Sequence, residues 1–363
     1  MKKSLTLVEL KEKLDSMRDK QEDYISNTGN LEFKSNATES VLSMRYDGGI
    51  KEFPVLDSAH EGIAVRLGIP QSYYQTMREK APELLDLNVN GWLNRLAKNQ
   101  LVRVLDGKVR AFLSDRYRCL DNIELLNMVI PHVEQNYSDF ELVSSGLTDR
   151  HMFLKFVSER IREDVVVGDT VQSGFVISNS EIGWGAVRVL PLIFRLVCTN
   201  GMIAATSIDG IRKNHIGSRI ECGLLETRLV DPAILGEKTD EFLNSVRTGI
   251  ESLKNSDAFN RYVNQLRATL THSYKDYDAE ELVRYAGSLL GISRNERKLV
   301  LAHYNLNGMK SQYGLLNAIT RASQDVEDYE RATELERIGS MMLNTTNVRL
   351  IDRHMEHFME DVA

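Results

Sequence analysis

Hydrophobic positions near the start of the chain recur every three or four residues. They are Leu7, Leu10, Leu14 and Met17, and lysines and glutamates lie between them. Because residues three and four apart share one face of an α-helix, this spacing predicts an amphipathic helix over residues 4–26.

The pattern then changes to the two-residue alternation that is typical of β-strands. A turn sequence that begins at Asp47 divides one such stretch and predicts a hairpin over residues 41–56. Asp106-Gly107 divides a second stretch, LVRVL and KVRAFL, and predicts a type I′ hairpin.

Two short helices are predicted between these hairpins, over residues 58–67 and 71–80. Gly68 is typical of the end of a helix, and Pro70 is compatible with the start of the next. Ala64 and Gly68 have the spacing of a helix-turn-helix, but the second helix has few basic residues. We therefore interpret this pair as a packing motif.

The rest of the chain divides into a β-rich and a helical part. After a predicted helix over residues 121–135, residues 140–203 are rich in Val, Ile, Phe, Thr and Gly, which favours a sheet. From about residue 240 the spacing is helical, and two helix starts have an N-cap residue followed by Glu at the third helical position: Asp278 with Glu281, and Ser293 with Glu296.

These elements predict an α+β fold, with a central antiparallel twisted sheet, flanking helices and an α-helical C-terminal module. We expect three regions: a helix, hairpin and helical region over residues 1–90, a basic β-rich domain over 91–230, and the helical module over 231–363. The boundary is placed near Asp231-Pro232.

Composition narrows the functional classes. The chain has 363 residues, of which 42% are hydrophobic and 27% are charged, so a disordered chain is excluded. The net charge of −7 excludes binding of DNA by bulk charge. The sequence has no apolar run long enough for a membrane span, and its three cysteines are widely spaced, so we expect a cytoplasmic protein without a membrane contact.

Charge is distributed unevenly along the chain. Residues 95–118 carry seven Lys and Arg against two Asp, and residues 188–219 carry five against one. Residues 321–363 carry five Arg against ten Asp and Glu. Any nucleic-acid site must therefore be a local basic patch in the middle of the sequence.

The second hairpin suggests such a patch. If its register follows a two-residue turn, Arg103 lies opposite Arg110, an arrangement that destabilises a sheet unless anions compensate it. Either a polyanion or the protein's own carboxylates would do so. Phe112 and Tyr117 are candidates for stacking on bases. The candidate nucleic-acid-binding residues are Arg103, Lys108, Arg110, Phe112, Arg116, Tyr117, Arg118 and Arg188.

Other chemistry has weak support in the sequence. It contains no Walker loop, GxGxxG or HExxH motif, and we assign no catalytic residue, metal ligand or cofactor. His354 and His357 are interpreted as solvated helix surface, and Cys198 as a buried thiol. Glu32-Phe33-Lys34 matches the short end of a nuclease motif without an evident upstream acid. Trp184, between glycines, is either a stacking platform or a buried anchor.

Several blocks of the sequence resemble the phage/plasmid-like proteins of unknown function, domain family 932. They are LGIPQSYYQTM, NVNGWL, VRAFLSDRYRCLDN, NSEIGWGAVRVLPLIFRLVCTNGMI, GLLNAITRAS and RATELERIGSMML. The resemblance implies residence on phages and plasmids in a bacterial cytoplasm, and it implies no catalytic residue. The order of elements is also similar to that of the Rad-type single-strand annealing recombinases of phages.

The leading hypothesis is a non-enzymatic, homo-oligomeric protein that binds single-stranded DNA in annealing or recombination. The alternative is an inhibitor of a host defence or repair enzyme that docks through the acidic helices of residues 321–363. A metal-dependent nuclease ranks third.

Overall fold

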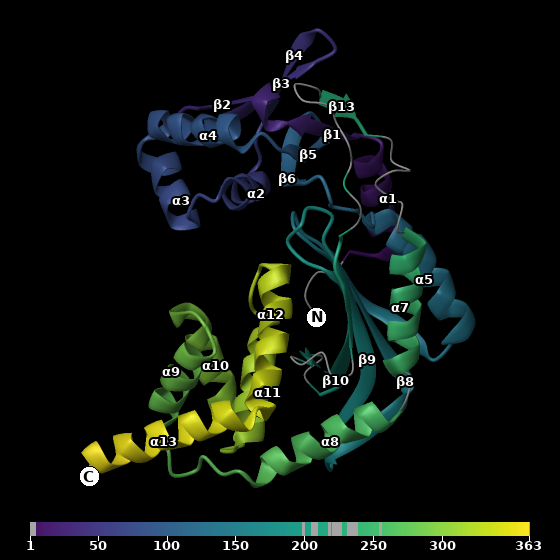
Figure 1. The fold of residues 1–363 in the computed structure, drawn as a ribbon. Helices are drawn as coiled ribbons and strands as arrows, with labels where there is room; N and C mark the ends of the chain where they lie inside the picture. The colour runs from purple at the N-terminus through teal and green to yellow at the C-terminus, as the bar shows by residue number, and fades with distance from the viewer. Residues whose placement is uncertain are drawn as a thin grey trace.

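The computed structural model describes residues 5–197, 200–204, 210–216, 219, 227–230, 239–253 and 256–362. Within them the chain has an α+β fold with three antiparallel sheets and a helical C-terminal region, so the predicted fold class is confirmed (Figure 1). None of the described helices is long and apolar enough to cross a membrane.

The first helix is shorter than predicted. Helix α1 (Leu7–Arg18) begins with a capping box, in which Thr6 and Glu9 bind each other's backbone N–H groups. Residues beyond it form strand β1 (Gln21–Asn27), so the prediction of a helix up to residue 26 is wrong. The strand pairs with β5 (Asn99–Leu105) and β13 (Thr227–Leu229) at its two edges, and Tyr24 and Ile25 pack into apolar clusters on its two faces. These tertiary contacts override the local helical preference.

The rest of the N-terminal region consists of a small sheet and three helices. Their bounds are η1 (Thr28–Asn30), β2 (Leu31–Ser35), β3 (Ser40–Tyr46), β4 (Gly49–Pro54), α2 (Asp57–Leu67), α3 (Gln71–Lys80), α4 (Pro82–Leu96) and β6 (Lys108–Ser114). The predicted hairpin over residues 41–56 and both short helices are confirmed. Their apolar faces form one core with β5 and β6.

The second hairpin turns at Asp106-Gly107 as predicted, with φ of +50° and +70°. Its register differs from the prediction. A β-bulge between Arg103 and Val104 places Arg103 opposite Ala111, so Arg103 does not lie opposite Arg110.

The central sheet follows helix α5 (Asn122–Asn136). Its strands are β7 (Phe140–Leu147), β8 (Met152–Val166), β9 (Asp169–Asn179), β10 (Val187–Arg195), β11 (Asn200–Ile203) and β12 (Ile211–Lys213). The order is β11-β10-β9-β8-β7, and β12 also pairs with β10.

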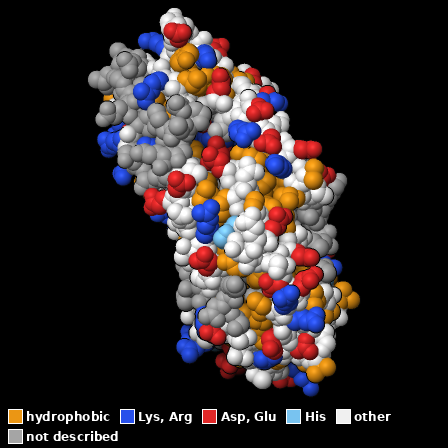
Figure 2. All heavy atoms as spheres, turned by 90° about the vertical axis from the view of Figure 1, so that its right-hand side faces the viewer, with side chains coloured by type: hydrophobic (Ala, Val, Ile, Leu, Met, Phe, Trp, Pro, Cys, Tyr) orange, Lys and Arg blue, Asp and Glu red, His pale blue; other side chains and the backbone are white. Residues whose placement is uncertain are grey.

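The two faces of this sheet have different environments. On the outer face, Phe156, Phe175 and Val189 pack against α1, α5 and α7 (Thr239–Leu253) in one apolar cluster. Figure 2 shows the molecule from this side, where the described acidic and basic side chains are interspersed. The inner face is turned toward the C-terminal helices (Figure 1).

The C-terminal helices share a second core. They are α8 (Ser256–Thr271), α9 (Ala279–Leu289), α10 (Arg294–Asn307), α11 (Gln312–Ala322), α12 (Tyr329–Ser340), η2 (Met341–Leu343) and α13 (Thr345–Val362). The predicted caps at Asp278 and Ser293 are confirmed. Helix α11 is buried almost throughout, and α12 packs on β11 and α11.

The predicted boundary at Asp231-Pro232 lies outside the described residues, and the division into three regions stays a prediction. The helices after residue 238 contact the sheet on both sides, because α7 packs on its outer face and α12 faces its inner one. The inner face of the central sheet, opposite α12, carries Arg188 and Arg212.

Candidate functional site

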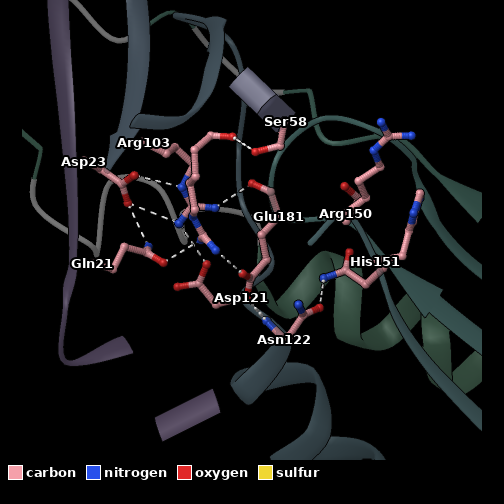
Figure 3. A network of polar contacts seen from close by, with 12 residues as sticks. Gln21, Asp23, Ser58, Arg103, Asp121, Asn122, Arg150, His151 and Glu181 are labelled. Carbon is pink, nitrogen blue, oxygen red and sulfur yellow. Dashed lines mark hydrogen bonds and ion pairs between the residues drawn. The ribbon is translucent and has the colours of Figure 1, made fainter. Parts of the chain in front are cut away.

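Arg103, on β5, is fully buried and bound by two carboxylates (Figure 3). Its Nε donates to Asp23 Oδ1 at 2.8 Å, and its Nη2 donates to Asp121 Oδ1 at 3.1 Å. The Nη1 group donates to the backbone oxygen of Glu181 at 2.7 Å. Burial opposes the charge, but Asp23 and the other nearby acidic groups raise the pKa of Arg103 well above its usual value.

Arg110, on β6, is also buried and paired. Its Nη1 lies 3.0 Å from Glu181 Oε2, and its Nη2 donates to Gln21 Oε1 at 2.7 Å. Both arginines of the hairpin therefore have partners within the protein. Of the two alternatives that the sequence leaves open, the structure shows the second: the protein's own carboxylates compensate the charges of Arg103 and Arg110.

Most other predicted residues are also in the interior. Phe112, Tyr117 and Arg118 are buried. The Tyr117 hydroxyl donates to the backbone oxygen of Ser180 at 2.8 Å. Because the rings of Phe112 and Tyr117 are both buried, neither is available to stack on a base. Lys108 and Arg116 are exposed, but they do not line the cleft described below.

Arg188 is the predicted residue that lies at a cleft. On the inner face of the sheet it is directly opposite Arg212 of β12, so two guanidinium side chains meet on adjacent strands. Arg337, on α12, faces them from the other side. Burial, with the charges of Arg212 and Arg337, holds the pKa of Arg188 below its usual value. Within the described part of the chain, neither Arg188 nor Arg212 has an ion pair.

These arginines line a cleft of about 600 Å³, which we call the arginine cleft. One wall is a row across four neighbouring strands, formed by Arg212, Arg188, Ser178 and Phe153. Helix α12 supplies the other wall, with Glu330, Thr333, Glu334 and Arg337. Because hydrogen-bonded strands lie about 4.8 Å apart, the row extends roughly 14 Å.

Three polar contacts hold α12 over the sheet. Lys155 Nζ, on β8, donates to Glu336 Oε2 at 2.6 Å, and both side chains are buried. The hydroxyls of Ser144 and Tyr329 lie 2.6 Å apart, and His151 Nδ1 lies 2.9 Å from Glu330 Oε1. Burial opposes the charge of Lys155, but Glu336 raises its pKa. The width of the cleft is thus set by groups from β7, β8 and α12.

The two carboxylates of the cleft are engaged by other side chains. Glu330 accepts from His151, and although burial opposes its charge, this contact lowers its pKa. Glu334 accepts from Arg331 at 2.5 Å and lies farther from Arg337, at 3.8 Å. Arg188 and Arg212 consequently remain open to an external anion. A guanidinium presents parallel N–H donors whose geometry matches phosphate or carboxylate oxygens.

Other candidate sites are occupied by internal contacts. Glu32 and Lys34 pair with each other on β2, and His354 Nε2 lies 2.5 Å from Glu281 Oε1. No group of three or more His, Cys, Asp and Glu suited to a metal ion occurs within the described ranges. Cys198 lies outside the described residues.

The acidic C-terminal segment is also paired internally. Glu336 binds Lys155, Asp325 lies 2.5 Å from His303, and Asp352 lies 3.0 Å from His272. These pairs reduce the acidic field that docking to a basic partner requires.

The fold and the site define an α+β protein built on a curled antiparallel sheet, with a basic cleft on its inner face. Residues 110–221 match the model of a family described as "Domain of unknown function (DUF932)", which confirms the resemblance to domain family 932 over this part of the chain. The association with phages and plasmids stays a prediction. The match includes Arg188 and Arg212, while Arg337 lies beyond it. No solved structure matches the chain.

No local sequence pattern singles out Arg212 or Arg337. Arg212 lies in the basic segment of residues 188–219. Its pairing with Arg188 cannot be predicted, because the residues between them show no periodic pattern that indicates a hairpin. Arg337 stands in the acidic segment and reaches the cleft only because α12 packs on the sheet.

Proposed function

We propose that this protein binds single-stranded nucleic acid, whose phosphates lie in the arginine cleft. The observation that carries the proposal is the pair Arg188 and Arg212, directly opposite on neighbouring strands and without an ion pair among the described residues. Like charges in this position destabilise a sheet, and a phosphate between them would offset the repulsion.

The form of the cleft supports a polymer more than a compact ion. The arginines lie along a row of strands and on the facing helix, and phosphate contacts in line are what a nucleic-acid backbone requires. Phosphate contacts give affinity that depends on salt and is largely independent of sequence.

We further propose that binding serves annealing or recombination on a phage or plasmid, with the protein acting as a homo-oligomer. The support is the similarity to the phage/plasmid-like family and, in the order of elements, to the phage annealing proteins. Mixing complementary strands with the protein, with hybridisation followed by fluorescence, tests this role separately from binding.

Fluorescence anisotropy of a labelled single-stranded oligonucleotide tests binding itself. The charge-reversed variant R188E/R212E is expected to lose at least about 100-fold in affinity, because two phosphate contacts become repulsive. The variant R45E is the control, because Arg45 is exposed on β3, which belongs to a different sheet from the cleft. Equal affinity of R188E/R212E and R45E would reject the proposed site.

A further inference from the structure

The guanidinium group of Arg150 lies over the indole ring of Trp184. Its guanidinium carbon is 3.6 Å from the centre of the ring, a stacking distance. Trp184 belongs to the loop between β9 and β10, and Arg150 precedes β8. Neither residue lines the arginine cleft.

The indole is fixed by the surrounding structure. Its Nε1 donates to the backbone oxygen of Ser58 at 3.4 Å, and the Trp184 backbone N–H donates to Ser180 Oγ at 3.1 Å. The ring packs at the edge of the apolar cluster that contains Ile182 and Leu113. Arg150 thus stacks on a surface that does not need to reorganise.

The guanidinium of Arg150 remains available on its far side. Arg150 is exposed, and its side chain makes no hydrogen bond or ion pair with the residues that the structure describes. A planar cation backed by an aromatic ring is a surface on which nucleobases stack.

This surface adjoins the arginine cleft. His151, the residue after Arg150, lines the cleft. Its imidazole also packs closely against Gly185, the residue after Trp184, because a Cβ added to Gly185 would lie only 2.8 Å from His151 Nε2. The charge of Arg150 also acts on Glu330, which lies on the opposite wall. Figure 3 shows Arg150 and His151 side by side.

We propose that Arg150 and Trp184 form a platform on which an unpaired nucleobase stacks, while the neighbouring phosphates bind Arg188 and Arg212. This inference rests on the proposed function and specifies it: the ligand is recognised by a base as well as by its charge. A polyanion without bases would bind in the arginine cleft but would not contact the platform.

Tryptophan fluorescence provides the test, because the chain has two tryptophans and Trp92 is exposed. In a W92F background, Trp184 is the single reporter. Titration with a single-stranded oligonucleotide is expected to quench its emission, whereas an abasic oligonucleotide of equal length binds without this quenching. In the same background, R150K keeps the charge but not the planar guanidinium. This variant should bind the single-stranded oligonucleotide about tenfold more weakly and bind the abasic oligonucleotide with unchanged affinity.

Two results would overturn the inference and differ in what they imply. Equal affinity for both oligonucleotides, with no effect of R150K on either, would remove the platform and leave the phosphate site intact. Failure of both oligonucleotides to bind would reject the proposed function and the platform together.

Discussion

Two pairs of arginines in this protein have opposite environments. Arg103 and Arg110 are buried and are bound by Asp23, Asp121 and Glu181. Arg188 and Arg212 lie at the arginine cleft, and the described residues provide neither with an ion pair. The first pair belongs to the stability of the fold, and we propose that the second binds a ligand.

The role of an arginine in this protein thus depends on its tertiary partner more than on its local sequence. Arg103 and Asp23 are 80 residues apart in the chain, and they meet because β1 and β5 pair in the same sheet. A basic hairpin in a sequence shows cations but not the carboxylates that cover them. Breaking each pair should therefore affect different properties.

The largest effect on stability is expected for Arg103→Met. It leaves Asp23 and Asp121 without their cation, and loss of one partner of a buried pair costs about 3–5 kcal/mol. Urea unfolding should show this decrease, while the exposed control Arg45→Met should change the free energy of unfolding by less than about 0.5 kcal/mol. Equal stability of the two variants would show that the buried network contributes little.

The next largest effect concerns the wall of the arginine cleft. Lys155→Met leaves Glu336 buried without a cation and should cost about 3 kcal/mol. The double variant Lys155→Met/Glu336→Met replaces both charges by apolar groups and should recover most of this loss in urea unfolding. A double variant as unstable as the single one would contradict this account of the pair.

Lowering the pH should destabilise the folded protein, because His215 is buried. Burial lowers the pKa of this imidazole to about 4 from 6.5, and Arg103 acts in the same direction. The unfolded chain therefore takes up a proton first, and stability falls as pH decreases from about 6.5 to 4, by about 2 kcal/mol at pH 5. His215→Gln should show a smaller decrease between pH 7 and pH 5, whereas His357→Gln, at an exposed position, should keep the wild-type decrease.

The smallest effect on stability is expected at the arginine cleft, and its sign is opposite. Arg188→Ala removes a like-charge contact across two strands and should leave the free energy of unfolding unchanged or raise it by about 0.2–1 kcal/mol. Urea unfolding at low salt measures it. A loss above about 2 kcal/mol would indicate that Arg188 has a structural partner.

The sequence predicts the local elements well and their assembly poorly. The turns at Asp47 and Asp106 and the caps at Asp278 and Ser293 follow from the chemistry of a few neighbouring residues, and the structure has all four. The register of the second hairpin depends on a bulge, which the alternation of residues does not show.

The same limit applies to the candidate site. Arg188 was predicted from local charge, whereas Arg337 becomes part of the cleft through the packing of α12. Seven predicted residues near the hairpin were chosen for their charge or ring, and five of them are buried: Arg103, Arg110, Phe112, Tyr117 and Arg118. Burial depends on contacts between distant segments.

The salt dependence of oligonucleotide binding shows whether Arg188 and Arg212 bind phosphate groups. Each phosphate contact to a single strand contributes about 0.7 to the slope of log K against log salt concentration. The variant R188A/R212A should therefore have a slope that is shallower than wild type by about 1.4, with its unfolding free energy retained. An unchanged slope in the folded variant would contradict the assignment of these arginines to phosphate.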